Sequence, residues 1–416
     1  MNRPPMPRVC MLVRNDCRTD YRVLKEAASL ARAGYTVTVV AINTYGPLER
    51  EERAGFAIVR VPVERSRRRL IQGCNLLPRA IWRMATAART VHADVYHAHD
   101  SDAVLPAWLA ARRVPRARLL YDAHEVGFGS LHQSQEYFPA PLALINWAWG
   151  LLNDRIIRQH TAAVITVNDV LADLQAAHYR IPRPAVVMNC PPRPQAPPEH
   201  STILAERIGV TPETPIVICQ GMLVRDRHGV GLENLIRAAP LFHRGAVVIM
   251  GRGAQFDELA GLAAQPPFAG RAFVLPAVPP EELLDYTSGA AIGAIPTEIH
   301  HPSLRYSSPN KLFEYLAVGL PVVTSDLPIV RRICEEYECG LVCDPTSPAS
   351  IAGTINRLLE DADLYARMRG GALAAAQVYN WQTQEQVLLD VYRRLLAGPS
   401  PKPDQSEIRN PRSTIP

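Results

Sequence analysis

Residues 307–325 read SSPNKLFEYLAVGLPVVTS, and this stretch predicts a loop, a helix and a buried strand in close succession. Pro309 suits the first turn of a helix, because the N–H that proline lacks would have no helical partner there. Gly319-Leu320-Pro321 ends the helix, and the β-branched residues that follow are typical of a buried parallel strand. The start of such a helix offers unpaired N–H groups and a positive dipole end to a phosphate.

Two charged side chains of this segment suit a nucleotide. Lys311 lies in the first helical turn, where a cation opposes the helix dipole unless an anion such as a diphosphate lies there. Glu314 follows on a neighbouring face, where its carboxylate could accept hydrogen bonds from both hydroxyls of a ribose. A capped surface helix with both side chains solvated fits the spacing equally well.

The same alternation of strand and helix signals extends outward from this segment in both directions. It is broken by CPPRPQAPP at 190–198, whose five prolines are typical of a stiff linker. The chain is therefore predicted to form two doubly wound, Rossmann-like α/β domains that face a central cleft. Two sheet edges that face each other could hold the donor and the acceptor of a transferred group. The expected parts are an N-terminal acceptor-side domain (1–192), a linker (193–202), a C-terminal donor domain (203–380), a helix packing back on the N-terminal domain (381–397) and a disordered tail (398–416).

Composition narrows the class of protein. The 416 residues carry a net charge of +5, from 45 basic and 40 acidic side chains, too small a surplus to indicate a nucleic-acid partner. The eight cysteines are scattered, which favours a reducing cytoplasm over a disulfide framework and does not match the spacing of a zinc site. The absence of a long apolar stretch predicts a soluble protein, and peripheral contact with the membrane stays open.

PNKLFEYLAVGLPVV at 309–323 resembles the donor-site signature of the bacterial family 4 glycosyltransferases (glycosyl transferases group 1), in their PNKxxEY-type branch. The similarity extends over roughly residues 8–395. It implies the GT-B fold, a nucleotide-diphosphate sugar as co-substrate, and retaining transfer without a metal or other cofactor. It also implies that Glu314 binds the ribose. Tyr306 stands where many members carry a glutamate that contacts the transferred sugar.

The resemblance implies further donor residues. Family members often grip the diphosphate with an arginine and a lysine after the first strand of the donor domain, and Met222 and Val230 occupy these positions here. We expect Arg225 or Arg227 to replace them, although both could be merely solvated. The donor-binding residues expected in all are Ser308, Pro309, Asn310, Lys311, Glu314, Gly251, Arg225 and Arg227.

The catalytic candidate lies in the first half. His124 follows a strand in YDAHE (121–125), and the resemblance implies that this histidine reaches the sugar near the reacting centre. We expect it to orient or polarise the donor rather than to act as a nucleophile. Candidates for the acceptor or sugar side are Asp16, Glu125 and Glu298. Asp100 and Asp102 have DxD spacing, but aspartates before a helix are ordinary caps, so no metal site is expected.

The sequence thus predicts a glycosyltransferase of cell-surface polysaccharide or glycolipid assembly, acting on a glycan or lipid-linked acceptor. A small-molecule acceptor remains an alternative. Two other classes also stay open: a nucleotide-sugar epimerase, and a non-catalytic relative that has lost its grip on the diphosphate. The residues at 222 and 230 are the reason for keeping the last of these.

Overall fold

The computed structural model describes residues 6–43, 46–63, 78–124, 140–196, 199–225, 229–300 and 302–398. Arg227 and Glu125 lie outside these ranges. The described part of the first half contains an eight-stranded sheet in the order β3-β4-β2-β1-β5-β6-β7-β8. Its strands are β1 (Arg8–Leu12), β2 (Thr36–Asn43), β3 (Glu49–Arg53), β4 (Phe56–Pro62), β5 (Val95–His99), β6 (Arg118–Ala123), β7 (Ala163–Thr166) and β8 (Ala185–Val186).

This sheet is parallel except for the pairing of β3 with β4. Of its two central strands, β1 is an apolar run after Arg8, as expected where both faces are covered, whereas β5 also buries His97 and His99. Val9 and Met11 of β1 belong to one core, and Cys10 and Leu12 belong to the core on the other side of the sheet. The helices in the described part of this half are α1 (Tyr21–Arg32), α3 (Pro78–Val91), α4 (Ser101–Ala111), α6 (Ala140–His160) and α7 (Asp169–Tyr179).

The second half holds a six-stranded parallel sheet in the order β11-β10-β9-β12-β13-β14. Its strands are β9 (Ile216–Met222), β10 (Ala246–Arg252), β11 (Ala272–Pro276), β12 (Ile292–Ile295), β13 (Val322–Thr324) and β14 (Gly340–Val342). Its helices are α8 (Ile203–Ile208), α10 (Gly231–Ala238), the 3₁₀ turn η1 (Ala239–Leu241), α11 (Phe256–Ala263), α12 (Pro280–Ser288), α13 (Pro302–Arg305), α14 (Asn310–Ala317), α15 (Pro328–Glu336), α16 (Pro348–Glu360) and α17 (Ala362–Val378).

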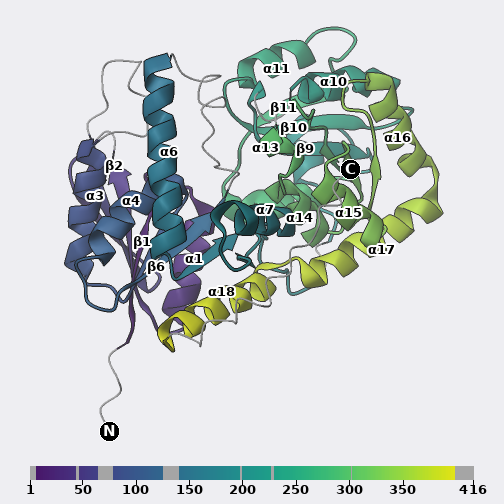
Figure 1. The fold of residues 1–416 in the computed structure, drawn as a ribbon. Helices are drawn as coiled ribbons and strands as arrows, with labels where there is room; N and C mark the ends of the chain where they lie inside the picture. The colour runs from purple at the N-terminus through teal and green to yellow at the C-terminus, as the bar shows by residue number, and fades with distance from the viewer. Residues whose placement is uncertain are drawn as a thin grey trace.

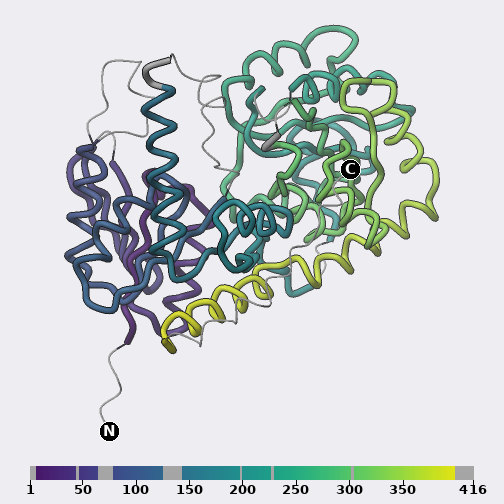
Figure 2. The backbone as a smooth tube through the Cα atoms, viewed as in Figure 1, coloured from purple at the N-terminus to yellow at the C-terminus, as the bar shows by residue number. Residues whose placement is uncertain are grey.

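The two halves lie side by side, and the last helix, α18 (Trp381–Leu396), runs back from the second half beneath the first (Figure 1). The tube view follows this return along α17 and α18 (Figure 2). Trp381 and Tyr392 of α18 are buried in the core that α1 forms with the first sheet. The indole N–H of Trp381 donates to Ser29 Oγ at 3.0 Å, and its backbone N–H donates to Pro191 O at 2.9 Å. The segment that leaves the first half at Pro191 and the helix that returns to it at Trp381 therefore contact each other beside α1.

Within the described residues, no helix combines the length and the apolar character that a bilayer crossing requires.

Candidate functional site

The carboxyl edges of the two sheets meet at the seam between the halves. Arg252 ends β10, and its guanidinium donates to Thr19 Oγ1, just before α1, at 3.3 Å. Ligands of open parallel sheets bind at this edge, because the strands stop there and the loops diverge. The candidate site is therefore built from the strand ends and the helix starts on the two sides of this seam.

On the donor side, α14 starts at Asn310, directly after Pro309. Pro309 has extended backbone angles (φ −66°, ψ 134°), and its side chain cannot cap the helix. The Leu312 N–H donates to Pro309 O at 3.0 Å, so the start of α14 offers an anion the N–H groups of its first two residues, Asn310 and Lys311.

Lys311 and Glu314 lie where α14 passes the end of β9. Lys311 is 8% exposed, and its ammonium lies 3.5 Å from Cys219 Sγ. Sulfur is a weak acceptor, so the three N–H donors of Lys311 are poorly used by this contact. The Glu314 carboxylate accepts a bond of 2.7 Å from the Gln220 amide, which in turn accepts from Thr287 at 3.0 Å. Burial raises the pKa of Glu314, against the opposing effects of Gln220 and Lys311.

Glycines allow the strand ends to approach closely. A Cβ on Gly251 would lie 1.9 Å from Gly221 O, so the pairing of β10 with β9 by itself requires glycine at position 251. Gly221 has φ 126°, a conformation that favours glycine, and a Cβ there would lie 3.7 Å from Lys311 Cε. Gly251 therefore allows β10 to lie close to β9, and Gly221 leaves no side chain between the β9 backbone and Lys311.

Two other residues expected at the donor or sugar side are engaged within the second half. The Arg225 guanidinium lies 2.5 Å from a Glu233 carboxylate oxygen and 2.8 Å from one of Glu258, on α10 and α11. Glu298 accepts the backbone N–H of Val230 at 3.1 Å, and Val230 is the N-cap of α10. Glu298 thus supports the 229–231 loop with a carboxylate.

On the opposite side of the seam, His124 follows β6 and lies between two carboxylates. Its Nε2 is 3.0 Å from Asp122 Oδ2, and its Nδ1 is 3.2 Å from Asp100 Oδ2. Burial by itself would lower the pKa of His124, but the two carboxylates hold it well above its ordinary value of 6.5. The two carboxylates therefore favour the charged form of His124.

Asp122 is itself held by Arg22 of α1. The Arg22 Nε and one terminal nitrogen donate to the two Asp122 oxygens at 2.8 and 2.9 Å, and the other terminal nitrogen donates to Val187 O at 2.7 Å. Burial would raise the pKa of Asp122, but Arg22 and His124 hold it well below its ordinary value. Arg22 thus holds the Asp122 carboxylate in the position from which it contacts His124 Nε2.

Asp100 is not the ordinary helix cap that its sequence position suggests. It precedes α4, but its carboxylate makes no capping bond to the described helix and instead accepts the His124 backbone N–H at 3.2 Å. Its backbone (φ 63°, ψ 166°) lies in a region that residues other than glycine rarely adopt. Backbone strain of this kind clusters at functional sites. Asp102 pairs with Arg14 at 2.7 Å.

Asp16, an acceptor-side candidate, lies in the loop after β1. Its carboxylate accepts the Arg18 backbone N–H at 3.1 Å, and its carbonyl accepts from Arg60 at 2.6 Å. Its side chain is 49% exposed, so a hydroxyl could still reach it.

Four metal-ligating side chains gather beneath His124: Glu26, His97, His99 and Asp122, with one ligand atom of each within 4.8 Å of the others. All four are buried. Arg22 lies 3.1 Å from Glu26 and 2.8 Å from Asp122, so a guanidinium already compensates both carboxylates. Burial raises the pKa of Glu26 to about 7, and a divalent cation in this cluster would lie close to the Arg22 guanidinium.

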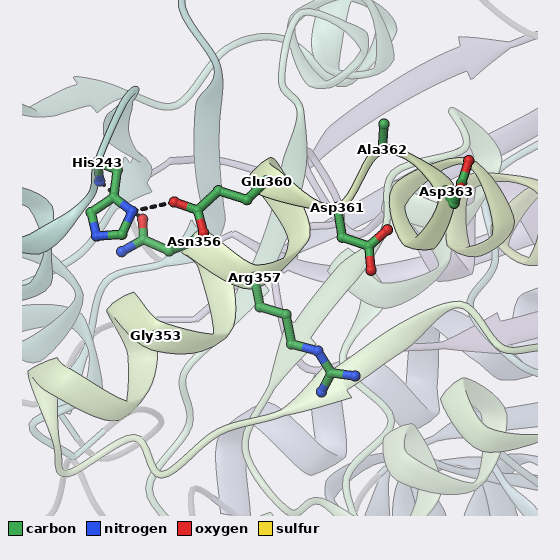
Figure 3. A pocket seen from close by; sticks show the side chains of 8 residues that line it. All are labelled: His243, Gly353, Asn356, Arg357, Glu360, Asp361, Ala362 and Asp363. Atoms are coloured by element: carbon green, nitrogen blue, oxygen red, sulfur yellow. Dashed lines mark hydrogen bonds and ion pairs between the residues drawn. The ribbon is translucent and has the colours of Figure 1, made fainter.

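A separate pocket lies on the outside of the second half (Figure 3). Its lining includes His243, which forms an ion pair with Glu360, as well as Arg357 and Asp361. His243 precedes β10, so this pocket lies toward the amino edge of the sheet, opposite the edge that carries Lys311 and Glu314.

Comparison with known families accounts for both halves of the chain. Residues 205–373 match the family "Glycosyl transferases group 1", and residues 20–192 match the "Glycosyl transferase 4-like domain". The chain belongs to the group 1 glycosyltransferases.

Two named relatives of this glycosyltransferase have the same description. A D-inositol 3-phosphate glycosyltransferase of Xylanimonas cellulosilytica is 26% identical over 313 residues, which are 72% of this chain and 71% of the relative. One of Acidothermus cellulolyticus is 30% identical over 213 residues, 48% of this chain and 45% of the relative. The second match thus spans less than half of the relative's length.

Solved structures agree with the GT-B fold expected from the sequence. Sucrose-phosphate synthase from Thermosynechococcus elongatus has a TM-score of 0.73 at 17% identity, covering 94% of this chain and 99% of that one. Anabaena HepE in complex with UDP and glucose has a TM-score of 0.63 at 17% identity, covering 93% and 99%. At such identities the likeness concerns the fold alone.

The sequence left Arg22, Asp122 and Asp100 of this glycosyltransferase without a role in the site. Asp122 lies within the quoted motif YDAHE (121–125), two residues before His124, and this spacing could have indicated its role. Arg22 is 100 residues from Asp122, so no local pattern connects the two.

Proposed function

We propose that this glycosyltransferase transfers a sugar from a nucleotide-diphosphate sugar to an acceptor hydroxyl, with retention at the anomeric carbon and without a metal ion or other cofactor. The observation that carries the proposal is the arrangement around α14, where a poorly partnered ammonium and a half-buried carboxylate flank one helix start. Lys311 and the α14 N–H groups suit a diphosphate, and Glu314 suits the ribose. Neither retention nor the absence of a metal follows from this geometry, and both rest on the resemblance.

The donor half supplies positive charge where a leaving diphosphate gains negative charge. The Lys311 ammonium and the dipole of α14 are fixed by packing before any substrate binds. Such preorganised groups stabilise a transition state without reorganisation during the reaction. Arg225 could join them only by leaving Glu233 and Glu258.

His124 contributes as a cation rather than as a base. Its two ring nitrogens face Asp122 and Asp100, so both carry protons that these carboxylates accept. An imidazolium has no lone pair with which to remove a proton from an acceptor hydroxyl. We assign it the role of polarising the sugar or the departing oxygen, with Asp100 as its more exposed partner.

The names of relatives bear on the acceptor. The D-inositol 3-phosphate glycosyltransferases are named for a small acceptor, which supports a small-molecule acceptor. A second observation keeps a lipid-linked acceptor and peripheral membrane contact as the other candidate. Helix α6 exposes Leu144 by 52% and Leu151 by 46%, an apolar surface of the kind that contacts lipid.

The test is thermal unfolding in the presence of UDP, GDP, dTDP or ADP, with wild type, Glu314→Ala and Glu335→Ala. A ligand at about one hundred times its dissociation constant adds about 2.7 kcal/mol to the stability of the folded state. We expect one nucleotide to raise the wild-type midpoint by a few degrees. Glu314→Ala should weaken its binding at least about tenfold, because a carboxylate accepting two hydroxyls is lost.

Glu335 is the control, because its side chain on α15 is 64% exposed and pairs with Arg331. Its replacement should leave the nucleotide shift unchanged. A wild-type protein that responds to none of the four nucleotides would contradict the proposed donor site. Nucleotide binding without sugar transfer to inositol phosphates, sugar phosphates or lipid acceptors would favour the non-catalytic alternative.

A further inference from the structure

The start of α7 in the first half contacts the donor half through three consecutive residues. Asn168 is fully buried and bonds to the 306–308 loop. Asp169 pairs with Arg332 of α15 at 3.2 Å. Val170 packs against the apolar core around α14. A helix of one half therefore abuts the loop that leads into the donor helix of the other.

Asn168 uses its two amide atoms on different halves of the protein. Its Oδ1 accepts the Leu171 N–H at 2.9 Å and so caps α7. Its Nδ2 donates to Tyr306 O at 3.0 Å and lies 3.4 Å from Ser308 Oγ. The amide thus joins the start of α7 to the backbone four residues before α14.

The other two contacts are less able to hold this loop. The Asp169–Arg332 pair is 41% and 48% exposed, and pairs of this kind contribute little because water screens them. Val170 contributes apolar contact, which does not fix a direction. The hydrogen bonds of Asn168 are directional and shielded from water, so they set the position of the loop.

We propose that Asn168 is a positioning residue for the donor site and acts through the 306–308 loop. This inference rests on the proposed binding of the nucleotide at the start of α14. Holding Tyr306 and Ser308 fixes the approach of the chain to Pro309, and hence the direction of the first N–H groups of α14. The affinity of the donor half for a nucleoside diphosphate therefore depends on a side chain supplied by the acceptor half.

The test compares three variants of the full chain. Asn168→Ser keeps an N-cap oxygen for α7 but removes the amide that reaches the loop. Asn168→Asp also keeps the cap, and it places an acceptor against the Tyr306 carbonyl. Asn380→Ser is the matched control, because Asn380 is a buried N-cap of α18 whose amide bonds only locally, to Ala376 O and Gln377 O at 2.9 and 2.8 Å.

The dissociation constants of UDP, GDP, dTDP and ADP are measured by calorimetry for each protein, together with the unfolding midpoints without ligand. For the tightest-binding nucleotide, Asn168→Ser should weaken affinity about threefold to tenfold, the range for losing one or two hydrogen bonds. Asn168→Asp should weaken it further. Asn380→Ser should lower the midpoint about as much as Asn168→Ser, with nucleotide affinity within about twofold of wild type.

Two outcomes would overturn the inference while leaving the proposed function intact. In the first, wild type binds a nucleotide and both Asn168 variants bind it equally well, so the residue is only a helix cap. In the second, Asn380→Ser loses as much affinity as Asn168→Ser, so the loss reflects general loosening. If wild type binds none of the four nucleotides, the proposed donor site fails and the inference fails with it.

Discussion

The ionisation of His124 is decided by its neighbours. A buried imidazole without carboxylates would be neutral at pH 7, because burial disfavours charge. Here Asp122 and Asp100 contact the two ring nitrogens, and Arg22 keeps Asp122 ionised. Since the pKa of His124 is raised, its charge contributes stability in full below about pH 6.5, and this contribution is lost as the pH rises through the folded-state pKa.

Asp100→Asn tests this charge. Asparagine tolerates positive φ nearly as well as aspartate but does not carry the negative charge. We expect the pKa of His124 to fall toward 6.5, and the alkaline decline of kcat/KM to move to lower pH by the same amount. Titration of the imidazole C–H signals by NMR reports the pKa directly. An unchanged pKa would show that Asp122 alone sets the charge.

His124→Ala should lower kcat about 100-fold to 1000-fold, the usual cost of removing one fixed group that stabilises a transition state. Nucleotide affinity should change little, because the proposed nucleotide contacts belong to α14. Kinetics with saturating donor, together with calorimetry, separate the two quantities. A parallel loss of nucleotide binding would place His124 among the nucleotide-binding groups instead.

Among the elements, α1 supplies the residue that holds Asp122 and, through it, His124. Arg22 and Glu26 on its inner face are buried among the strands, whereas Arg32 near its end is 60% exposed. An apolar residue at position 22 would fit the helical pattern equally well. A helical pattern of apolar residues therefore does not reveal that the inner face of α1 carries a buried ion pair.

Arg22→Met should reduce the unfolding free energy of the first half by about 3–5 kcal/mol, because it leaves the Asp122 carboxylate buried without its main partner. Arg32→Met on the same helix should change it by about 0.5 kcal/mol or less, since that ion pair is at the surface. Urea denaturation followed by circular dichroism measures both variants. Equal effects would mean that water reaches Asp122.

At the scale of the whole molecule, the return of α18 makes a helix that follows the donor half part of the first core. Trp381 and Leu388 are buried with residues of β1, β2 and α1, more than 300 positions earlier in the chain. The first half is therefore completed only by the last described helix. Its stability should depend on residues that lie beyond the donor half in sequence.

Trp381→Ala should lower the unfolding free energy by about 3–5 kcal/mol, the usual cost of removing a large aromatic side chain from a core. Val378→Ala, three residues earlier on α17, removes a side chain that is 45% exposed and should change little. Thermal unfolding followed by circular dichroism compares the two. A small effect of Trp381→Ala would indicate that α18 only rests on the surface of the first half.

The sequence by itself determined the α/β character of both halves and the helix that carries Lys311 and Glu314. These features are local: apolar periodicity, turn residues and helix starts are encoded within one or two dozen neighbouring positions. Only the tertiary structure decided which groups face one another across long separations. Arg22 meets Asp122, and Asn168 meets the 306–308 loop, because strands and helices far apart in sequence end at one seam. The charge of the groups at that seam and the orientation of the 306–308 loop depend on these non-local contacts, so no local sequence pattern could predict them.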